Sequence, residues 1–126
     1  MRMDNPNADE QPAAVVQNQS DLHADGGYYE FQGILYGGVE SSFIIVDAAP
    51  GQGVRLHSHP YAEIFIVQAG SATYTVGTTT LEVSAGQIVI APANVPHKFI
   101  NTGTDQLKQV DIHASKQFIT TWLEDV

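Results

Sequence analysis

The sequence contains no cysteine at all. Disulfide bonds and thiolate metal ligands are therefore excluded, and any bound metal ion must be held by nitrogen and oxygen atoms. The absence of cysteine also fits a reducing compartment, where disulfides do not persist, and we expect the protein to be cytoplasmic.

Positive charge and long apolar runs are also scarce. The chain has five Lys and Arg residues and fourteen Asp and Glu residues, which gives a formal net charge of −9 at pH 7. This balance removes the electrostatic basis for binding nucleic acid or anionic lipid. No apolar run is long enough to span a bilayer, and residues 1–27 contain no apolar stretch of the kind found in secretory signals. We therefore expect neither nucleic acid nor a membrane as a partner.

The length of 126 residues predicts one domain with one hydrophobic core. Residues 1–25 are rich in Asn, Asp, Gln and Pro. They predict a flexible N-terminal arm, or an arm that becomes ordered by adding to a sheet. Residues 26–126 are expected to form the single folded domain. His23 lies in the arm, and we interpret it as a solvated side chain.

From Tyr28 onward, short apolar runs alternate with turns that contain Gly, Pro, Asn or Ser. Many short strands at this spacing indicate an all-β sandwich, jelly roll or small barrel. The predicted strands cover residues 33–36, 42–47, 55–58, 63–68, 71–76, 79–83, 88–91, 97–101 and 107–113.

The C-terminal residues are the one part of the chain that resembles a helix. Ser115 is a suitable N-cap, and the apolar residues after it recur at helical spacing, which places them on one face. These residues are Phe118, Ile119, Trp122 and Leu123. We therefore predict a short C-terminal helix, with the tryptophan as an anchor in the core or in a lid.

The segment from Gly51 to Gly70 contains a potential metal site. In an extended strand, alternate side chains share a face, so His57, His59 and Glu63 are expected to point the same way. Two imidazoles and a carboxylate form the open-sided ligand set of many non-heme metal centres. His97, in a second segment, offers one more imidazole. Pro60 interrupts the strand, so the alternation is more secure from position 57 to 59 than from 59 to 63.

Both segments resemble the sequence motifs of the cupin family. The first motif is matched by Gly51, five residues, His57-x-His59, three residues, Glu63, six residues and Gly70. The second is matched by Gly86, five residues, Pro92, and then His97 and Asn101, with Asn94 where glycine is usual. Asn tolerates positive φ better than other non-glycine residues, so we expect this turn to form.

The resemblance implies a double-stranded β-helix, that is, a jelly-roll barrel, with a metal ion inside. The implied ligands are His57, His59, Glu63 and His97. The implied cofactor is one divalent transition metal ion, whose identity (Fe, Mn, Ni, Co, Cu or Zn) is left open. The alternative is that the four side chains are pocket polar groups without a metal. The resemblance also implies a homodimer, and the charge of −9 requires its interface to be apolar.

Strand parity also suggests residues for a substrate pocket. Arg55 lies two positions before a predicted ligand, and is either a contact for a substrate anion or a solvated charge at a strand end. Phe65 and Phe99 each lie two positions after a predicted ligand. They are either apolar pocket walls or ordinary core residues.

Asp111 and His113 share one face of the predicted strand 107–113. They are proton-transfer groups if that face looks into the barrel, and surface residues if it looks outward. We favour the inward orientation, because the segment DIHASKQF that begins at Asp111 is similar to the tail of small pectin-degradation cupins that linearise unsaturated uronates. Those proteins usually carry Gln at the position of Glu63, and an Arg where this chain has Lys116 and Gln117. We therefore do not assign that activity.

The leading functional hypothesis is a small-molecule metalloenzyme of dioxygenase, decarboxylase, isomerase or lyase type. The alternative is a non-catalytic module that binds a small molecule or sugar. A third possibility is a structural or storage barrel whose metal serves stability alone. The fold does not decide among these functions, because one fold hosts many activities.

Overall fold

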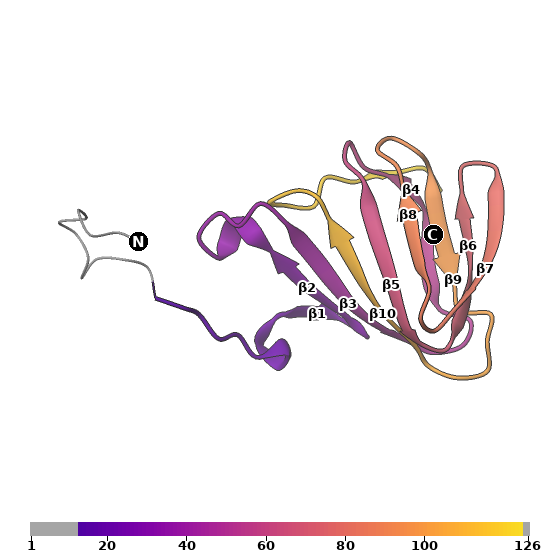
Figure 1. Ribbon diagram of the computed structural model, residues 1–126, viewed down its shortest axis with the longest axis horizontal. Coiled ribbons are helices and arrows are strands. Elements are labelled where there is room, and N and C mark those ends of the chain that lie inside the picture. The colour runs from indigo at the N-terminus through magenta and orange to yellow at the C-terminus, as the bar shows by residue number, and fades with distance from the viewer. Residues whose placement is uncertain (1–12, 125–126) are drawn as a thin grey trace.

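The computed structural model describes residues 13–124, which form two antiparallel β-sheets that face each other (Figure 1). The six-stranded sheet has the order β1-β2-β3-β10-β5-β8, and the five-stranded sheet has the order β11-β4-β9-β6-β7. The strands are β1 (His23–Asp25), β2 (Tyr28–Gln32), β3 (Ser42–Ala48), β4 (Gly53–Ser58), β5 (Glu63–Ala69), β6 (Ser71–Val76), β7 (Thr79–Ser84), β8 (Ile88–Ala91), β9 (His97–Ile100), β10 (Leu107–His113) and β11 (Thr121–Trp122). The predicted all-β jelly-roll barrel is confirmed.

The hydrophobic core lies between the two sheets. Along β5 and β10, buried and more exposed residues alternate, so each strand directs one face inward. The core residues come from both sheets and are Val46, Ala48, Phe65, Val67, Ala72, Tyr74, Val83, Val89, Ala91, Phe99 and Leu107. This packing holds the inward residues of β5 and β10 in fixed positions, and the candidate site is built from their neighbours.

Asn94 lies in the turn between β8 and β9, inside the second motif. Its φ of +66° places it in the left-handed region, as expected for the residue that stands where glycine is usual. The Asn94 N–H donates a hydrogen bond of 2.7 Å to the carbonyl oxygen of His59. The turn therefore ties the segment that precedes His97 to the segment that carries His59.

The predictions of strands were accurate in the middle of the chain and failed near the N-terminus. Residues 33–36 were predicted as a strand, but Gly33–Leu35 is a 3₁₀ turn, η3. A Cβ on Gly33 would collide with the carbonyl oxygens of Val39 and Ser41, so the chain folds back tightly here. Strands β1 and β2 were not predicted.

The predicted C-terminal helix is wrong, because the chain after β10 is extended and ends in β11. Its backbone groups pair with other elements: the Ile34 N–H donates to the Lys116 carbonyl over 2.8 Å, and the Leu123 N–H to the Leu56 carbonyl over 2.9 Å. Pairing of Thr121 with Ser58 then adds this segment to β4. These tertiary hydrogen bonds outweigh the helical preference that the spacing of the apolar residues predicted. The same spacing also suits an extended segment that lies across a pocket.

The N-terminal arm is described only in part, since residues 1–12 lie outside the described residues. A 3₁₀ turn, η2 (Gln19–Asp21), precedes β1, and β1 pairs with β2 at the edge of the six-stranded sheet. His23 lies in β1 and is exposed. The domain boundary at residue 25 remains a prediction. Within residues 13–124, no helix is long and apolar enough to cross a membrane.

Candidate metal centre

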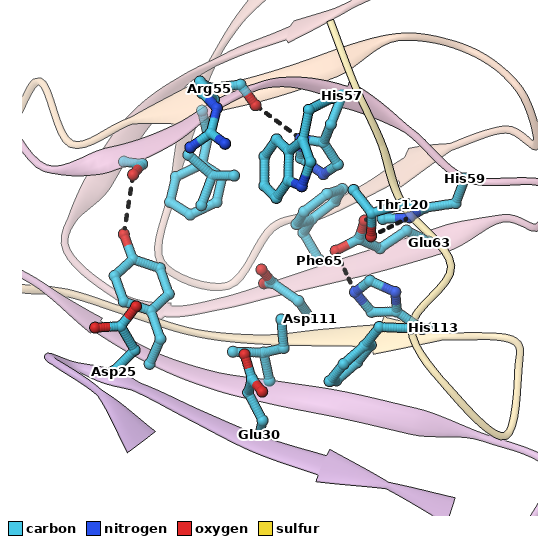
Figure 2. A pocket seen from close by; sticks show the side chains of 17 residues that line it. Asp25, Glu30, Arg55, His57, His59, Glu63, Phe65, Asp111, His113 and Thr120 are labelled. Atoms are coloured by element: carbon cyan, nitrogen blue, oxygen red, sulfur yellow. Dashed lines mark hydrogen bonds and ion pairs between the residues drawn. The ribbon is translucent and has the colours of Figure 1, made fainter. Parts of the chain in front are cut away.

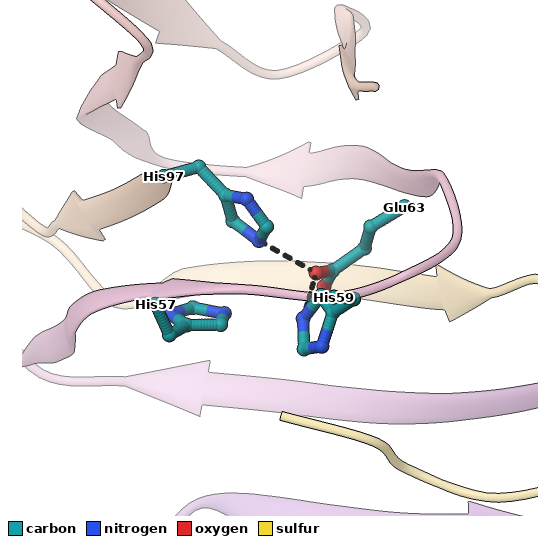
Figure 3. A group of neighbouring side chains, drawn as sticks. All are labelled: His57, His59, Glu63 and His97. Atoms are coloured by element: carbon teal, nitrogen blue, oxygen red, sulfur yellow. Dashed lines mark hydrogen bonds and ion pairs between the residues drawn. The ribbon is translucent and has the colours of Figure 1, made fainter. Parts of the chain in front are cut away.

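Four buried side chains converge at one end of the barrel: His57, His59, Glu63 and His97. His57 lies near the end of β4 and His59 directly after it, while Glu63 and His97 are the first residues of β5 and β9. One ligand atom from each side chain lies within 4.8 Å of all the others (Figure 3). Both sheets therefore contribute to a single centre.

The backbone fixes the tautomer of each of the three histidines. Nδ1 of His57 lies 2.7 Å from the Arg55 carbonyl, Nδ1 of His97 lies 2.9 Å from the Val95 carbonyl, and Nδ1 of His59 lies 2.9 Å from the Ile119 carbonyl. A carbonyl oxygen only accepts, so each Nδ1 carries the proton and donates. In the neutral rings the lone pair is then on Nε2, the nitrogen presented to a metal ion.

The Nε2 atoms of His59 and His97 each lie 2.9 Å from Oε1 of Glu63. At His59 the contact lacks hydrogen-bond geometry, so its buried Nε2 has no hydrogen-bond partner within the described part of the chain. A lone pair that faces a carboxylate oxygen at this distance requires a positive species between them, either a proton or a metal ion. Nitrogen and carboxylate ligands in this arrangement fit a divalent transition metal ion.

The protonation states of the ligands are set by burial and by their contacts with one another. Burial lowers the pKa of His57 to about 4, which leaves this ring neutral at pH 7. Burial alone would raise the pKa of Glu63, but the ring nitrogens of His113, His59 and His97 around its carboxylate outweigh it and hold that pKa far below its ordinary value. Glu63 is therefore an anion. Burial would lower the pKa of His97, but its hydrogen bond to Glu63 raises it.

His113 faces inward and contacts the second oxygen of Glu63. Its Nε2 lies 3.1 Å from Oε2 of Glu63, and its Nδ1 lies 2.6 Å from the Tyr61 hydroxyl. The Tyr61 hydroxyl accepts the Ile119 N–H over 3.2 Å, so its own proton is free to be donated to Nδ1 of His113. The Nε2–H of His113 then faces the carboxylate. This tautomer is opposite to that of the three predicted ligands and suits a group that orients Glu63.

Asp111 also faces inward, and Figure 2 shows its carboxyl group in the pocket. The Gln109 side-chain amide donates to Asp111 Oδ1 over 2.8 Å, and the Tyr74 hydroxyl donates to Gln109 Oε1. Burial, followed by the charge of Glu63, raises the pKa of Asp111 well above its ordinary value. Burial and the neighbouring anion therefore favour the neutral form of Asp111.

The pocket in front of these groups has a volume of about 600 Å³. Phe65 and Phe99 belong to the core and also line the pocket, so both predicted descriptions apply to them. Arg55 lines the pocket but is not a freely solvated charge. Its Nε donates to the Glu124 carbonyl over 2.9 Å, and its guanidinium carbon lies 4.1 Å from the centre of the Trp122 ring.

The roles of Tyr61 and Gln109, and the contacts made by Ile119 and Trp122, were not identified from the sequence. Tyr61 shares strand parity with His59 and Glu63, and this parity was the available signal. Gln109 shares parity with Asp111 in the same way. The contacts made by Ile119 and Trp122 had no such signal, because they depend on the path of the chain after β10.

Comparisons with known proteins agree with the fold. A stretch of 81 residues is 31% identical to an uncharacterised protein of Streptomyces coelicolor, and covers 64% of this chain and 73% of that protein. An uncharacterised conserved protein of Klebsiella pneumoniae with a double-stranded β-helix domain superposes with a TM-score of 0.70 and 21% identity, covering 90% of this chain and 100% of that chain.

A larger structure with the same fold is oxalate decarboxylase from Bacillus subtilis. It superposes with a TM-score of 0.73 and 22% identity over 88% of this chain, which spans 33% of that protein. Structures at this level of identity establish the fold alone. The family model described as a cupin domain matches residues 44–113, more than half of the chain, and this range contains all four converging side chains and the strands that carry them. The chain therefore belongs to the cupin domain family.

Proposed function

We propose that the protein binds one divalent transition metal ion through His57, His59, Glu63 and His97 and is a small-molecule metalloenzyme. The observation that carries the proposal is the fixed tautomer of three buried imidazoles, whose Nε2 atoms surround an ionised carboxylate. A metal ion held there would polarise a carbonyl or carboxylate oxygen of a substrate, or activate dioxygen. The remaining steps are assigned to residues of the chain itself.

Asp111 is assigned the role of proton donor. It lines the pocket and burial favours its neutral form, and the Gln109 amide that already bonds to Oδ1 remains in place to stabilise the carboxylate left after proton transfer. The proton goes to a substrate atom that gains negative charge, and water in the pocket restores it. His113 is the second proposed catalytic residue, and its contact with Oε2 also keeps Glu63 oriented.

We infer a small carboxylic acid as substrate, bound on the Arg55 side of the pocket, because Asp25 and Glu30, which also line it, would repel an anion. Arg55 is the only permanently cationic side chain that lines the pocket among residues 13–124, while Phe65 and Phe99 supply apolar walls. A carboxylate on the substrate would find the unused guanidinium nitrogens of Arg55. The structural neighbour named oxalate decarboxylase agrees with a small carboxylic acid as the substrate class. We leave the choice among dioxygenase, decarboxylase, isomerase and lyase chemistry open.

Turnover of small carboxylic acids by the metal-loaded protein tests this proposal. The assay follows oxygen consumption and carbon dioxide release for a panel of mono- and dicarboxylic acids, with Glu63→Ala and Asp111→Asn as variants. We expect at least about a hundredfold loss of rate in Asp111→Asn, because positioned acids contribute about 10²–10⁴-fold. Equal rates in wild type and both variants would refute the enzyme. Tight binding of an acid without turnover would favour the non-catalytic binding module.

We also propose that the protein is a homodimer that buries the outer face of the six-stranded sheet. Two rows of apolar side chains cross five strands of this face in register. The first row is Phe31, Phe43, Ile112, Ile64 and Ile90, and the second is Tyr29, Ile45, Val110, Ile66 and Ile88. Ile88 and Ile90 are each 62% exposed. A second copy fits this face, because two identical apolar surfaces meet without the repulsion that a net charge of −9 causes elsewhere.

The size of the face agrees with a dimer interface. The five strands have five, seven, seven, seven and four residues, and at about 4.8 Å between strands and about 3.4 Å per residue they cover roughly 500 Å² in projection. A stable interface buries about 800 Å² of accessible surface per partner. Light scattering after size exclusion should give a dimer for the wild type and for Thr80→Glu on β7, and a monomer for Ile64→Glu and Ile90→Glu. A monomeric wild type, or dimers throughout, would refute the assignment.

A further inference from the structure

The C-terminal strap, residues 115–124, crosses from the six-stranded sheet to the five-stranded sheet (Figure 1) and passes beside His59, whose Nδ1 lies 2.9 Å from the Ile119 carbonyl. Near its start, the Phe118 N–H donates to the Gln32 side chain over 3.0 Å. Near its end, Trp122 is the β-sheet partner of the predicted ligand His57. The strap therefore spans the site between two anchored ends.

The strap determines the tautomer of one predicted ligand, His59. The carbonyls that fix His57 and His97 belong to Arg55 and Val95, two residues before each ring, so they are in place whatever the strap does. The carbonyl that accepts from Nδ1 of His59 belongs to Ile119, sixty residues away along the chain. The Thr120 hydroxyl lies 3.3 Å from the same nitrogen (Figure 2). Without the strap, nothing else in residues 13–124 holds the His59 proton on Nδ1.

Aromatic side chains of the strap also cover the site. The Trp122 ring lies 5.0 Å from the His57 ring, and the Phe118 ring lies 4.8 Å from the His113 ring. Both aromatic residues line the pocket, so they limit the access of water to these histidines.

The far end of the strap is fastened by Glu124. Its carboxylate accepts the Leu56 N–H over 2.9 Å and lies 3.2 Å from Nζ of Lys98, and its carbonyl accepts from Arg55. None of these contacts involves a predicted metal ligand. The end of the strap can therefore be released by substitution without changing the metal-binding side chains.

We propose that the strap is a positioning element of the metal centre, so that strap docking and metal binding stabilise each other. The proposal rests on the proposed metal site. Docking presents Nε2 of His59 to the metal ion, and a metal ion on Nε2 strengthens the hydrogen bond from Nδ1 to Ile119 because it makes the N–H more acidic. Such a coupling is reciprocal: whatever factor the strap contributes to metal affinity, the metal contributes to strap docking.

Metal affinity in strap variants tests the first half of this coupling. The dissociation constants for Mn²⁺ and Zn²⁺ are measured by chelator competition for wild type, for the chain ending at Ala114, and for Glu124→Ala. Loss of an outer hydrogen-bond partner typically weakens metal affinity by about 10–100-fold, and we expect this loss for the shortened chain. Glu124→Ala should cause a smaller loss of metal affinity. If the shortened chain does not fold, the comparison of this variant with wild type still tests the proposal. Glu82→Ala is the matched control, because it removes an exposed glutamate on β7 that accepts one side-chain hydrogen bond.

Hydrogen exchange tests the reciprocal half in the unmodified protein. Zn²⁺ should slow exchange of the Ile119 and Leu123 amides, which bond to Tyr61 and Leu56, more than exchange of amides in β6 and β7. Trp122 is the only tryptophan in the sequence, so its emission should change with the same midpoint as binding. Metal binding with unchanged strap exchange, and affinity within twofold in both strap variants, would overturn this proposal alone. A wild type that binds no metal would overturn the metal site as well.

Discussion

Removal of the Tyr61 hydroxyl tests the hydrogen-bond chain from the strap to Glu63. The hydroxyl donates to Nδ1 of His113 over 2.6 Å and accepts the Ile119 N–H over 3.2 Å. Burial raises the pKa of Tyr61 to about 12, so the hydroxyl keeps its proton at all physiological pH values. Tyr61→Phe leaves a buried acceptor on His113 without its donor and an amide without its acceptor.

The expected cost follows from these two losses. A buried polar group without its partner costs about 1–3 kcal/mol, whereas the Ile119 amide lies at the surface and water can replace its partner. We expect a total loss of about 2–3 kcal/mol in the free energy of unfolding, which lowers the melting temperature by roughly 5–10 °C in a chain of this size. Urea and thermal denaturation measure this loss. The matched control is Tyr36→Phe, because the Tyr36 hydroxyl has no hydrogen bond within residues 13–124.

The same variant has a spectroscopic readout that stability alone does not provide. Nitrogen-15 spectra of histidine distinguish a proton on Nδ1 from one on Nε2. In the wild type we expect His113 to carry its proton on Nε2 and His59 on Nδ1, and in Tyr61→Phe we expect His113 to lose this preference. Equal stability of the Tyr61→Phe and Tyr36→Phe variants, or a wild-type His113 with its proton on Nδ1, would refute the proposed chain.

Three further predictions follow from individual buried groups. The folded-state pKa of Asp111 is raised above its ordinary value of 3.8, so the folded protein loses stability as pH rises from about 4 toward that raised pKa. Asp111→Asn should remove this pH dependence of stability in urea titrations between pH 4 and 8. The same pH dependence in the variant would contradict the assignment to Asp111. The pKa of His97 is raised above 6.5, and metal must displace the Nε2 proton, so metal affinity should fall as pH drops below about 7; equal affinity at pH 7.5 and 5.5 would contradict this reasoning. Phe65 is 1% exposed and packs on Tyr74 and Phe99, so Phe65→Ala should cost about 3–5 kcal/mol, and a loss below about 1 kcal/mol would show that the core is not continuous there.

The convergence of His57, His59, Glu63 and His97 was predictable from the sequence, because local rules place these residues. His57 lies in β4 and His59 follows directly after it, and positive φ at Asn94 holds the turn before His97, so alternation and turn chemistry were enough to bring them together. Strand β2 was missed for a physical reason. Its five residues are all partly buried, since one face lines the pocket and the other belongs to the apolar outer face, and this removes the polar alternation that marks a strand.

The C-terminal strap shows where sequence patterns stop being informative. The spacing of Phe118, Ile119, Trp122 and Leu123 suits a helical face, but the structure uses these residues to cover a pocket formed by distant strands. The protonation state of Asp111 was equally inaccessible, because it depends on burial and on the charge of Glu63. Both features arise from contacts between residues that are far apart in the chain.

Measurement of the metal content of the protein tests the proposed metal site most directly. The protein is purified without an affinity tag, dialysed against Mn²⁺, Fe²⁺ or Zn²⁺, and analysed by elemental mass spectrometry beside His59→Ala and the surface control Glu82→Ala. The geometry predicts about one tightly bound ion per chain in the wild type and in the control, and little or none in His59→Ala. A folded wild type that retains no ion under any of these conditions would contradict the account and leave the four side chains as polar groups of a binding pocket.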